Sequence, residues 1–332
     1  FSAMQKDGWE FLLCIDSEPS ITNQEKSGGV IYTGSIGNIT IFTLFVGKES
    51  HVGEFYDGIN AAVLTAKMIY DIEGDPNTAD SYDGRHFSPA SCLKFKDFTA
   101  GYSVTLPARS AVIINLLTAK KSVTEILAYF TQKAKESGEA ALRKHYGLET
   151  IKVITFSELK NMVTGFEGEI SLETTAKEDA DIELVNRLIT DAGLSGPLAV
   201  VGFIPPYCGA KLNEKKTLSE IKAAEAAEDV AAYAEKLTGS RLAVEAVYEG
   251  ISDLSEMGGV PEDIEVLKDN MAGYGKMITY PFEEMKSLAI PVINLGPIGK
   301  DAHKPTERVF IPYLTQTLPL LLKRLIENYN TF

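Results

Sequence analysis

Two loops of this sequence place residue types that bind metal ions directly after apolar segments. Segment 290–295 is rich in β-branched side chains, which is typical of a buried strand, and Gly and Pro residues then open a loop that carries His303. Near the start of the chain, the apolar segment 10–15 is followed by Asp16 and Glu18. Open α/β sheets bind ligands at the carboxyl ends of strands, and imidazole and carboxylate groups both bind zinc. These positions are therefore candidates for a metal-dependent site.

The same residue types also have ordinary structural explanations. A histidine in a loop is more often a surface residue than a metal ligand. Two acids after a strand are costly to bury, but a polar loop satisfies them as well as a metal does. From these residues alone, a metal site and a pair of solvated loops both stay open.

Strands that alternate with helices are expected to position the two loops. The expected strands are 10–15, 198–204, 242–247 and 290–295, and the expected long helices are 217–237 and 314–328. This alternation indicates an α/β domain with a mostly parallel sheet.

A second, smaller unit is expected inside this domain. Ser122 and Glu125 form a capping box, which predicts the start of a long helix. The expected elements of the unit are strand 38–46, helix 59–70, strands 102–107 and 110–117, helix 122–146 and strand 151–154, with an irregular segment at 71–98. The order β-α-β-β-α-β is that of a split α/β sandwich. The sequence thus predicts a discontinuous domain of residues 1–31 plus 159–332, interrupted by an inserted domain of residues 32–158.

Composition narrows the class of protein. The chain has 332 residues, of which 45% are hydrophobic and 23% charged, and this is enough for two domains with a large core. The net charge of −14 argues against nucleic acid and anionic membranes as partners. No apolar run reaches the ~20 residues of a membrane span, and no secretory signal is expected at the start. Three widely spaced cysteines, Cys14, Cys92 and Cys208, fit a reducing cytoplasm.

Five short motifs occur in a fixed order along the chain. They are Ser17-Glu18-Pro19, Tyr32-Thr33-Gly34-Ser35-Ile36-Gly37, Val46-Gly47-Lys48-Glu49-Ser50-His51-Val52-Gly53, Gly250-Ile251-Ser252-Asp253 and Gly296-Pro297-Ile298-Gly299-Lys300-Asp301-Ala302-His303-Lys304. Taken together, they resemble the zinc aminoacylase and carboxypeptidase superfamily, peptidase family M20, and within it the branch of the arginine-utilisation protein RocB. Each motif alone is weak, but five in family order across nearly the whole chain are specific.

The resemblance implies a catalytic domain that holds two zinc ions and an inserted lid domain that forms a homodimer. Glu18 matches the carboxylate ligand of one zinc ion, and His303 matches the imidazole ligand of the other. The strand 38–46 is expected to offer the edge or face through which two lids pair. The resemblance thus implies two metal ligands, one near each end of the chain.

Three further residues match positions that act on the substrate. His51 matches a lid histidine that reaches the active site of a partner subunit and stabilises the oxyanion; the alternative is a histidine on the lid surface. Ser252 and Asp253 match a turn beside the substrate, although Ile251 replaces the usual Thr, and the alternative is a plain loop. His86 and His145 match nothing in the family and are expected to be solvated.

The chain departs from the family in its catalytic motifs. The chemistry needs a His-x-Asp motif and a Glu-Glu pair, of which the first Glu is the general base. None of the four histidines is followed two residues later by Asp, and the only Glu-Glu pair, at 283–284, lies far from the expected place. We therefore expect that the N-terminal part of the catalytic domain is missing and that this chain alone neither holds zinc stoichiometrically nor hydrolyses amides.

The lid departs from the family as well. Acyl-amino-acid members hold the substrate carboxylate with an Asn-x-x-Pro motif and a strand Arg, and here Val104 and Leu117 take these positions. An N-acyl amino acid is therefore not the expected substrate. The sequence predicts a zinc-dependent amidohydrolase or peptidase for a small amide or peptide, in amino-acid and specifically arginine utilisation. The alternative is a non-catalytic protein that retains the fold for binding or assembly.

Overall fold

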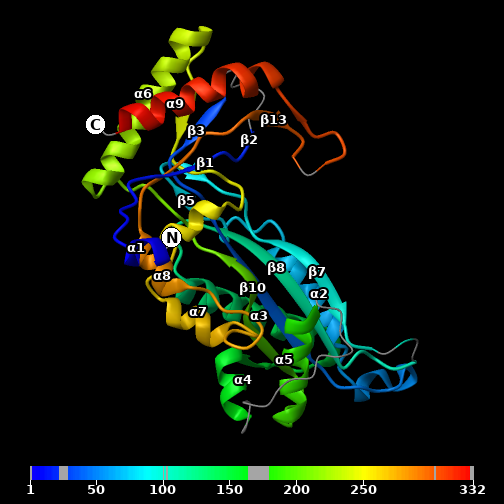
Figure 1. The fold of residues 1–332 in the computed structure, drawn as a ribbon. Coiled ribbons are helices and arrows are strands. Elements are labelled where there is room, and N and C mark those ends of the chain that lie inside the picture. Colours follow the sequence, from blue (N-terminus) through cyan, green and yellow to red (C-terminus); the bar gives the residue numbers. More distant parts are fainter. Residues whose placement is uncertain are drawn as a thin grey trace.

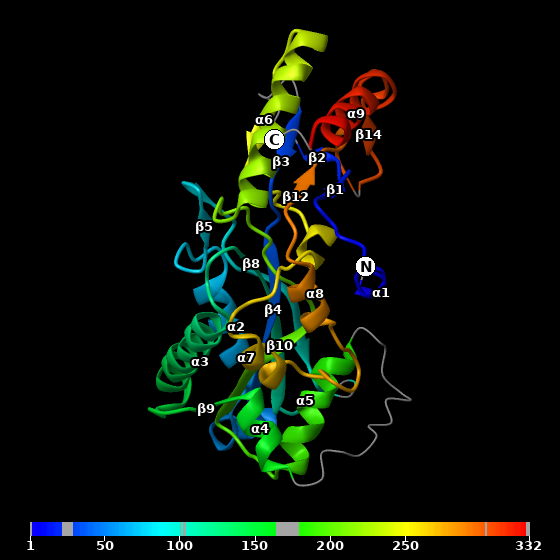
Figure 2. The same ribbon diagram turned by 60° about the vertical axis from the view of Figure 1, so that its left-hand side comes forward.

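The structure, a computed structural model, describes residues 2–21, 29–99, 101, 104–163, 179–302 and 304–329. Its two larger β-sheets lie at opposite ends of an elongated molecule (Figure 1). The long helices α6 (Leu218–Thr238) and α9 (Leu318–Asn328) lie together at the end of the smaller of these sheets, and Figure 2 shows the same grouping from another side.

The four-stranded sheet combines strands from near both ends of the sequence. Its strands, in spatial order, are β1 (Cys14–Asp16), β12 (Val292–Asn294), β3 (Val30–Tyr32) and β11 (Ala243–Glu245). β1 pairs parallel with β12 and β3 pairs parallel with β11, whereas β12 and β3 meet in one antiparallel pair. Ile31 and Ile293 are buried against the alanine-rich face of α6 and the leucines of α9. The mostly parallel α/β arrangement that the sequence predicts is confirmed.

The five-stranded sheet combines four strands of the inserted part of the chain with one strand from outside it, β10 (Leu198–Cys208). Its strands, in spatial order, are β7 (Ser91–Asp97), β8 (Arg109–Thr118), β4 (Gly37–Val46), β10 and β9 (Lys152–Thr155). Alternate residues of β4 point to opposite faces, so Ile41 packs against one pair of helices and Phe42 against another. The helices are α2 (Ala61–Ile72) and α3 (Val123–Tyr146) on the first face, and α4 (Phe156–Met162) and α5 (Ala180–Asp191) on the second.

Three expectations for this sheet are wrong. The strand expected at 198–204 in the sheet of the interrupted domain is β10, which pairs with β4 and β9. The described part of the strand expected at 102–107, residues 104–107, forms no strand beyond a single bridge at Thr105, and β7, which pairs with β8, lies in a segment expected to be irregular. β4 offers no edge, because it lies between β8 and β10, and every one of its residues is buried. The sheet of the inserted unit therefore extends beyond residues 32–158.

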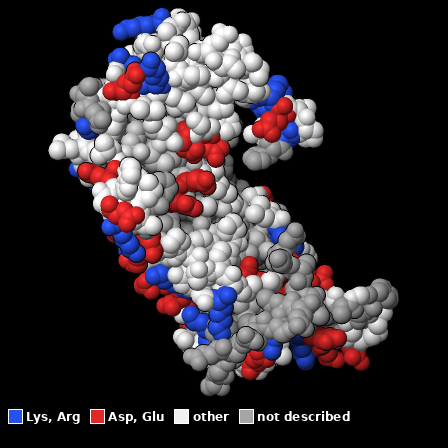
Figure 3. Space-filling view, in the orientation of Figure 1, with Lys and Arg blue, Asp and Glu red and all other residues white. Residues whose placement is uncertain are grey.

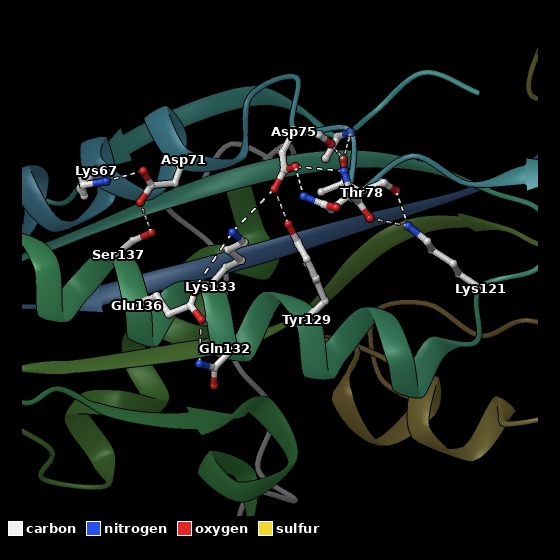
Figure 4. A network of polar contacts seen from close by, with 12 residues as sticks. Lys67, Asp71, Asp75, Thr78, Lys121, Tyr129, Gln132, Lys133, Glu136 and Ser137 are labelled. Atoms are coloured by element: carbon white, nitrogen blue, oxygen red, sulfur yellow. Dashed lines mark hydrogen bonds and ion pairs between the residues drawn. The ribbon is translucent and has the colours of Figure 1, made fainter. Parts of the chain in front are cut away.

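Polar contacts hold α3 against α2 and the turn that follows it (Figure 4). Ser137 Oγ donates to Asp71 Oδ2 at 2.6 Å, and Tyr129 Oη donates to Asp75 Oδ2 at 2.6 Å. The Ser122 capping box is formed as predicted, and α3 ends at Gly147, whose φ of 67° is the left-handed conformation that glycine adopts readily. α3 is therefore fixed at its start, along its length and at its end.

A short crossing joins the two sheets. Between β3 and β4, Ser35 N donates to Lys211 O at 2.7 Å, and Ile36 N donates to Tyr248 O at 2.9 Å. A Cβ atom at Gly34 would lie 2.6 Å from Lys211 O, so only glycine fits at this position. The segment between β3 and β4, which joins the two sheets, is thus held by backbone hydrogen bonds and is not a free linker.

The remaining elements are short. They are α1 (Ser2–Lys6), β2 (Ser20–Ile21), η1 (Val52–Asp57), β5 (Ser81–Tyr82), β6 (Arg85–His86), η3 (Asp253–Glu256), α7 (Ile264–Asn270), α8 (Phe282–Leu288), β13 (Ile298–Lys300), β14 (Arg308–Val309) and the π-helical turn η4 (Tyr313–Thr317). Over the described ranges, no helix combines the length and apolar character needed to cross a bilayer.

Candidate functional site

The parallel pairing of β1 and β12 brings the two candidate loops together. In this pairing Asp16 lies opposite Asn294, so the carboxyl ends of both strands meet at one edge. Beyond the strands, β2 and β13 also pair in parallel, with Ser20 opposite Ile298. The chain closes tightly between these pairs, because a Cβ atom at Gly296 would collide with the carbonyl oxygen of Glu18. The loop that holds Glu18 and the loop that follows β12 therefore run side by side.

Ser252 joins this edge from a third segment. Its Oγ donates to Asp16 Oδ2 at 2.9 Å and accepts from Leu254 N at 3.2 Å, which caps the start of η3. The side chain is buried, so it holds β1 and η3 together rather than facing solvent. Asp253, the next residue, is exposed. Burial raises the pKa of the Cys14 thiol, and the charges of Asp16 and Asp253 raise it further.

Glu18 and Tyr248 form the second part of the site. Glu18 is half-buried in the loop after β1. Burial raises the pKa of the Tyr248 hydroxyl to about 12, and the nearby negative charges of Glu18 and Asp16 contribute to the shift. At neutral pH this hydroxyl therefore keeps its proton. Its ring packs edge-to-face on Tyr32, with centroids 5.2 Å apart, which fixes its orientation. Figure 3 shows acidic side chains gathered on the part of the surface near β1.

His303 lies outside the described residues, so its expected proximity to Glu18 stays a prediction. The described residues on either side of it, Ala302 and Lys304, belong to the loop that follows β13. β13 pairs in parallel with β2; Glu18 precedes β2, whereas this loop follows β13, so the two loops leave opposite ends of the β2–β13 pair.

His51 lies far from this edge within one chain. It is exposed and precedes η1, where its Nδ1 accepts from Gly53 N at 3.1 Å. β4 separates it from the crossing at Ser35, and a ten-residue strand spans roughly 30 Å at ~3.3 Å per residue. Figure 1 shows η1 at the far end of the five-stranded sheet from β1. One chain therefore does not bring His51 to Glu18.

The residues at this edge do not complete a metal site. Among the described residues, no group of three or more His, Cys, Asp or Glu side chains is arranged to hold a metal ion. Asp16 is already engaged, because its second carboxylate oxygen, Oδ1, accepts from Ser17 N at 2.7 Å. Zinc sites in proteins use three or four ligands. The donor set of the described chain therefore falls short of a zinc site.

Two residues of this edge are absent from the motif-based prediction. Tyr248 precedes the predicted turn at 250–253, and nothing in its sequence context marks it. Asn294 is buried in β12 between Asp16 and Tyr32, and neither of its amide atoms has a hydrogen-bond partner among the described residues. A polar residue within the apolar segment 290–295 is the signal that could have identified Asn294.

The comparisons with known proteins agree with this geometry. No family model matches the chain. The uncharacterized protein YqjN of Bacillus subtilis (strain 168) is 27% identical over 338 residues, which cover 93% of this chain and 60% of YqjN. Protein RocB of the same organism is 24% identical over 339 residues, which cover 90% of this chain and 58% of RocB. The chain thus spans less than two thirds of the length of these curated relatives.

One solved structure shows the same fold. Aminopeptidase PepT from Bacillus cereus ATCC 10987 has a TM-score of 0.50 and 13% sequence identity, with 96% of this chain and 57% of PepT covered. At that identity the likeness concerns the fold alone. The resemblance drawn from the five motifs is thereby confirmed. The chain is similar in sequence to RocB over most of its length and shares its α/β fold with an aminopeptidase.

Proposed function

We propose that this protein is a metal-dependent hydrolase of small peptides or amides. The observation that carries the proposal is the parallel pairing of β1 with β12, which brings Glu18, Asp16 and Ser252 to one edge. The sequence likeness to RocB and the fold shared with an aminopeptidase support it. The part of the chain around the four-stranded sheet would carry the chemistry, and the unit around the five-stranded sheet would serve as the lid.

In this proposal the site binds two zinc ions. Glu18 is a ligand of one zinc ion, and His303 is a ligand of the other. A bound zinc ion polarises a carbonyl group and lowers the pKa of a bound water molecule. The described residues do not complete the site, so we assign no catalytic step to them. Ser252 would keep β1 and η3 in register, Asp253 would face the substrate, and Tyr248 would offer a neutral donor beside Glu18.

A homodimer would supply His51 to the site. The edges of the five-stranded sheet are β7 and β9 rather than the central strand β4, and we assign the pairing of two lids to β7. On β7, Leu93 is 64% exposed and Phe95 is 45% exposed, which is unusual for large apolar side chains on an isolated edge. Two lids paired through β7 would bury these side chains.

The physiological setting is proposed from the same resemblance. We place the activity in amino-acid utilisation, specifically that of arginine, because the motifs match the RocB branch. All three cysteines are free thiols, which favours a reducing compartment such as the cytoplasm.

Metal content and hydrolysis test this proposal together. Protein from the natural source, whatever its length there, should hold two metal ions per chain and hydrolyse dipeptides or N-acyl amides. The same protein with Glu18→Gln should lose at least 100-fold of its activity, since a positioned metal ligand supports the reaction directly. The 332-residue polypeptide on its own should hold less than one metal ion and show no turnover. Tight metal binding by this polypeptide would contradict the assignment of its ligands.

The alternative function is a non-catalytic role in binding or assembly. The observation that favours it is the lack of any complete metal-ligand group among the described residues. Protein from the natural source that holds no metal and hydrolyses no amide would establish this alternative and overturn the first.

A further inference from the structure

The far end of the five-stranded sheet holds a cavity that the proposed hydrolase site does not use. Two chain segments run antiparallel there: Val46 pairs with Arg109, Leu106 N donates to Ser50 O at 2.9 Å, and His51 pairs with Thr105. Between these segments and α5 lies a cavity of about 420 Å³. Its wall includes Glu49, Thr99, Thr105, Arg109 and Asn186. A volume of this size accommodates a small molecule.

Arg109 is the principal charged group of this cavity. Its Nη1 donates to Asn186 O at 2.7 Å, to Asn186 Oδ1 at 2.7 Å and to Thr190 Oγ1 at 2.8 Å, all of which are uncharged acceptors. Nε and Nη2 have no acceptor within the described ranges of the chain. One edge of the guanidinium is therefore anchored to α5, and the donors of the other edge face no acceptor among the described residues.

No carboxylate of the described residues compensates the charge of this guanidinium. Arg109 is half-buried, and burial lowers its pKa. Of the carboxylates in the described parts of the chain, none lies within ion-pair distance of it. A partly desolvated charge without a partner is unfavourable, and a carboxylate that accepts two parallel hydrogen bonds from Nε and Nη2 would relieve that cost. The arrangement is thus suited to a bound oxyanion.

Glu49 adds an opposite charge to the same wall. Its side chain is exposed and makes no ion pair with any described residue, Arg109 included. Two opposite charges that line one cavity without pairing are complementary to a ligand that carries both signs. Thr99 Oγ1, which has no hydrogen-bond partner among the described residues, offers a further polar contact.

We propose that this cavity binds a small zwitterion, a free amino acid or a short peptide, with its carboxylate on Arg109 and its ammonium group near Glu49. The site lies on the lid, about 30 Å along β4 from the crossing between the sheets. It requires no metal ion, so the proposal stands or falls independently of the hydrolase function.

Calorimetric titration of the 332-residue chain tests this site. Glycine and triglycine serve as probes for the two sizes of ligand, and acetate and methylamine serve as probes that carry a single charge. We expect at least one zwitterion to bind more tightly than both single-charge probes. Stronger binding of triglycine would identify a short peptide as the ligand, and stronger binding of glycine would identify an amino acid. No binding of either zwitterion, or equal binding of acetate, would overturn the proposal.

Variants of the two charged residues give a second test. Arg109→Gln should weaken zwitterion binding about 10- to 100-fold, because it removes a charge-assisted bidentate contact. Glu49→Gln should weaken zwitterion binding about threefold and leave acetate binding unchanged, because an exposed ion pair contributes little.

A control variant separates the loss of a specific contact from a general loss of positive charge. Arg187→Gln removes a positive charge from the exposed side of α5. It should bind the zwitterion as the unaltered chain does. If Arg109→Gln unfolds, the titration of Glu49→Gln still tests the proposal. An unchanged zwitterion affinity of Glu49→Gln would contradict it.

Discussion

At the scale of single residues, Gly296 shows how closely the site depends on backbone contact. The loops after β1 and β12 touch at this position, where a side chain would collide with the carbonyl oxygen of Glu18. Gly296→Ala should therefore lower the free energy of unfolding by roughly 1–3 kcal/mol, as overpacking of a tight contact does. Urea denaturation monitored by circular dichroism measures this change. An unaltered midpoint would mean that the two loops are not held together in solution.

Asp181 provides a residue-scale test of burial. It lies against the turn at Gly273 and Met277, has no hydrogen bond or ion pair among the described residues, and burial raises its pKa to about 6. A carboxyl group whose folded pKa exceeds its unfolded pKa destabilises the fold at high pH, so its cost grows as the pH rises from 4 to 7.

Asp181→Asn should remove this pH-dependent cost. A shift of about two pKa units corresponds to ~3 kcal/mol, and partial exposure reduces it, so we expect a gain in unfolding free energy of about 1–2 kcal/mol at pH 8. The gain should shrink toward pH 4. Asp191→Asn, at the exposed end of α5, is the matched control and should show no such trend. A gain that does not depend on pH would contradict the assigned burial.

At the scale of elements, the contact between α2 and α3 should contribute measurably to stability. Tyr129 Oη donates to Asp75, and this hydrogen bond is the largest cause of the lowered pKa of Asp75. Tyr129→Phe should lower the free energy of unfolding by about 1–2 kcal/mol at pH 7, since it leaves a charged acceptor with fewer donors. Because the folded pKa of Asp75 is lowered, this contribution should fade as the pH falls through the carboxyl range.

Gln132→Ala is the matched control for Tyr129→Phe. Gln132 lies on the exposed side of the same helix, where its Nε2 donates to Glu136 at 2.9 Å (Figure 4). Its removal should change the free energy of unfolding by less than about 0.5 kcal/mol. Equal effects of the two substitutions would show that the contact with Asp75 does not hold α3 in place.

Helix starts could be predicted from the sequence because capping is local. The box at Ser122 predicts the start of α3 and is formed in the structure, and capping boxes of the same kind begin α4 at Thr155 and α6 at Thr217. Four residues contain all of the information that a capping box needs.

Strand partners could not be predicted in the same way. β10 is an apolar run that fits either sheet, and its partners β4 and β9 are distant in sequence. β7 was missed although Leu93-Lys94-Phe95-Lys96 alternates apolar and basic residues, which is typical of an edge strand. A register irregularity between Cys92 and Lys94 interrupts its pairing with β8. Pairing is a long-range choice, which local alternation does not determine.

At the scale of the whole molecule, the motifs identified the kinship with RocB, and our proposal places the chemistry at the edge where β1 and β12 end. Glu18 and Ser252 fall at that edge, whereas His51 falls at the opposite end of the five-stranded sheet. Sequence motifs carry no information on this separation, because it follows from the direction in which β4 leaves the crossing. Because of this separation, our proposal requires that two chains assemble for His51 to act at this edge.

Cross-linking of cysteine pairs tests this account most directly. In a background with Cys14, Cys92 and Cys208 replaced by Ser, one variant carries Glu18→Cys with His303→Cys, and a second carries Glu18→Cys with His51→Cys. The reagent is a bismaleimide that spans about 10 Å, the scale set by two metal ions ~4 Å apart and their ligand bonds. Electrophoresis and peptide mass spectrometry separate links within a chain from links between chains.

The account predicts a link within one chain for the pair 18 and 303, and a link only between two chains for the pair 18 and 51. The first result would place both expected metal ligands at one edge, and the second would place His51 at the site of a partner. A link within one chain between 18 and 51, or no link between 18 and 303, would contradict it.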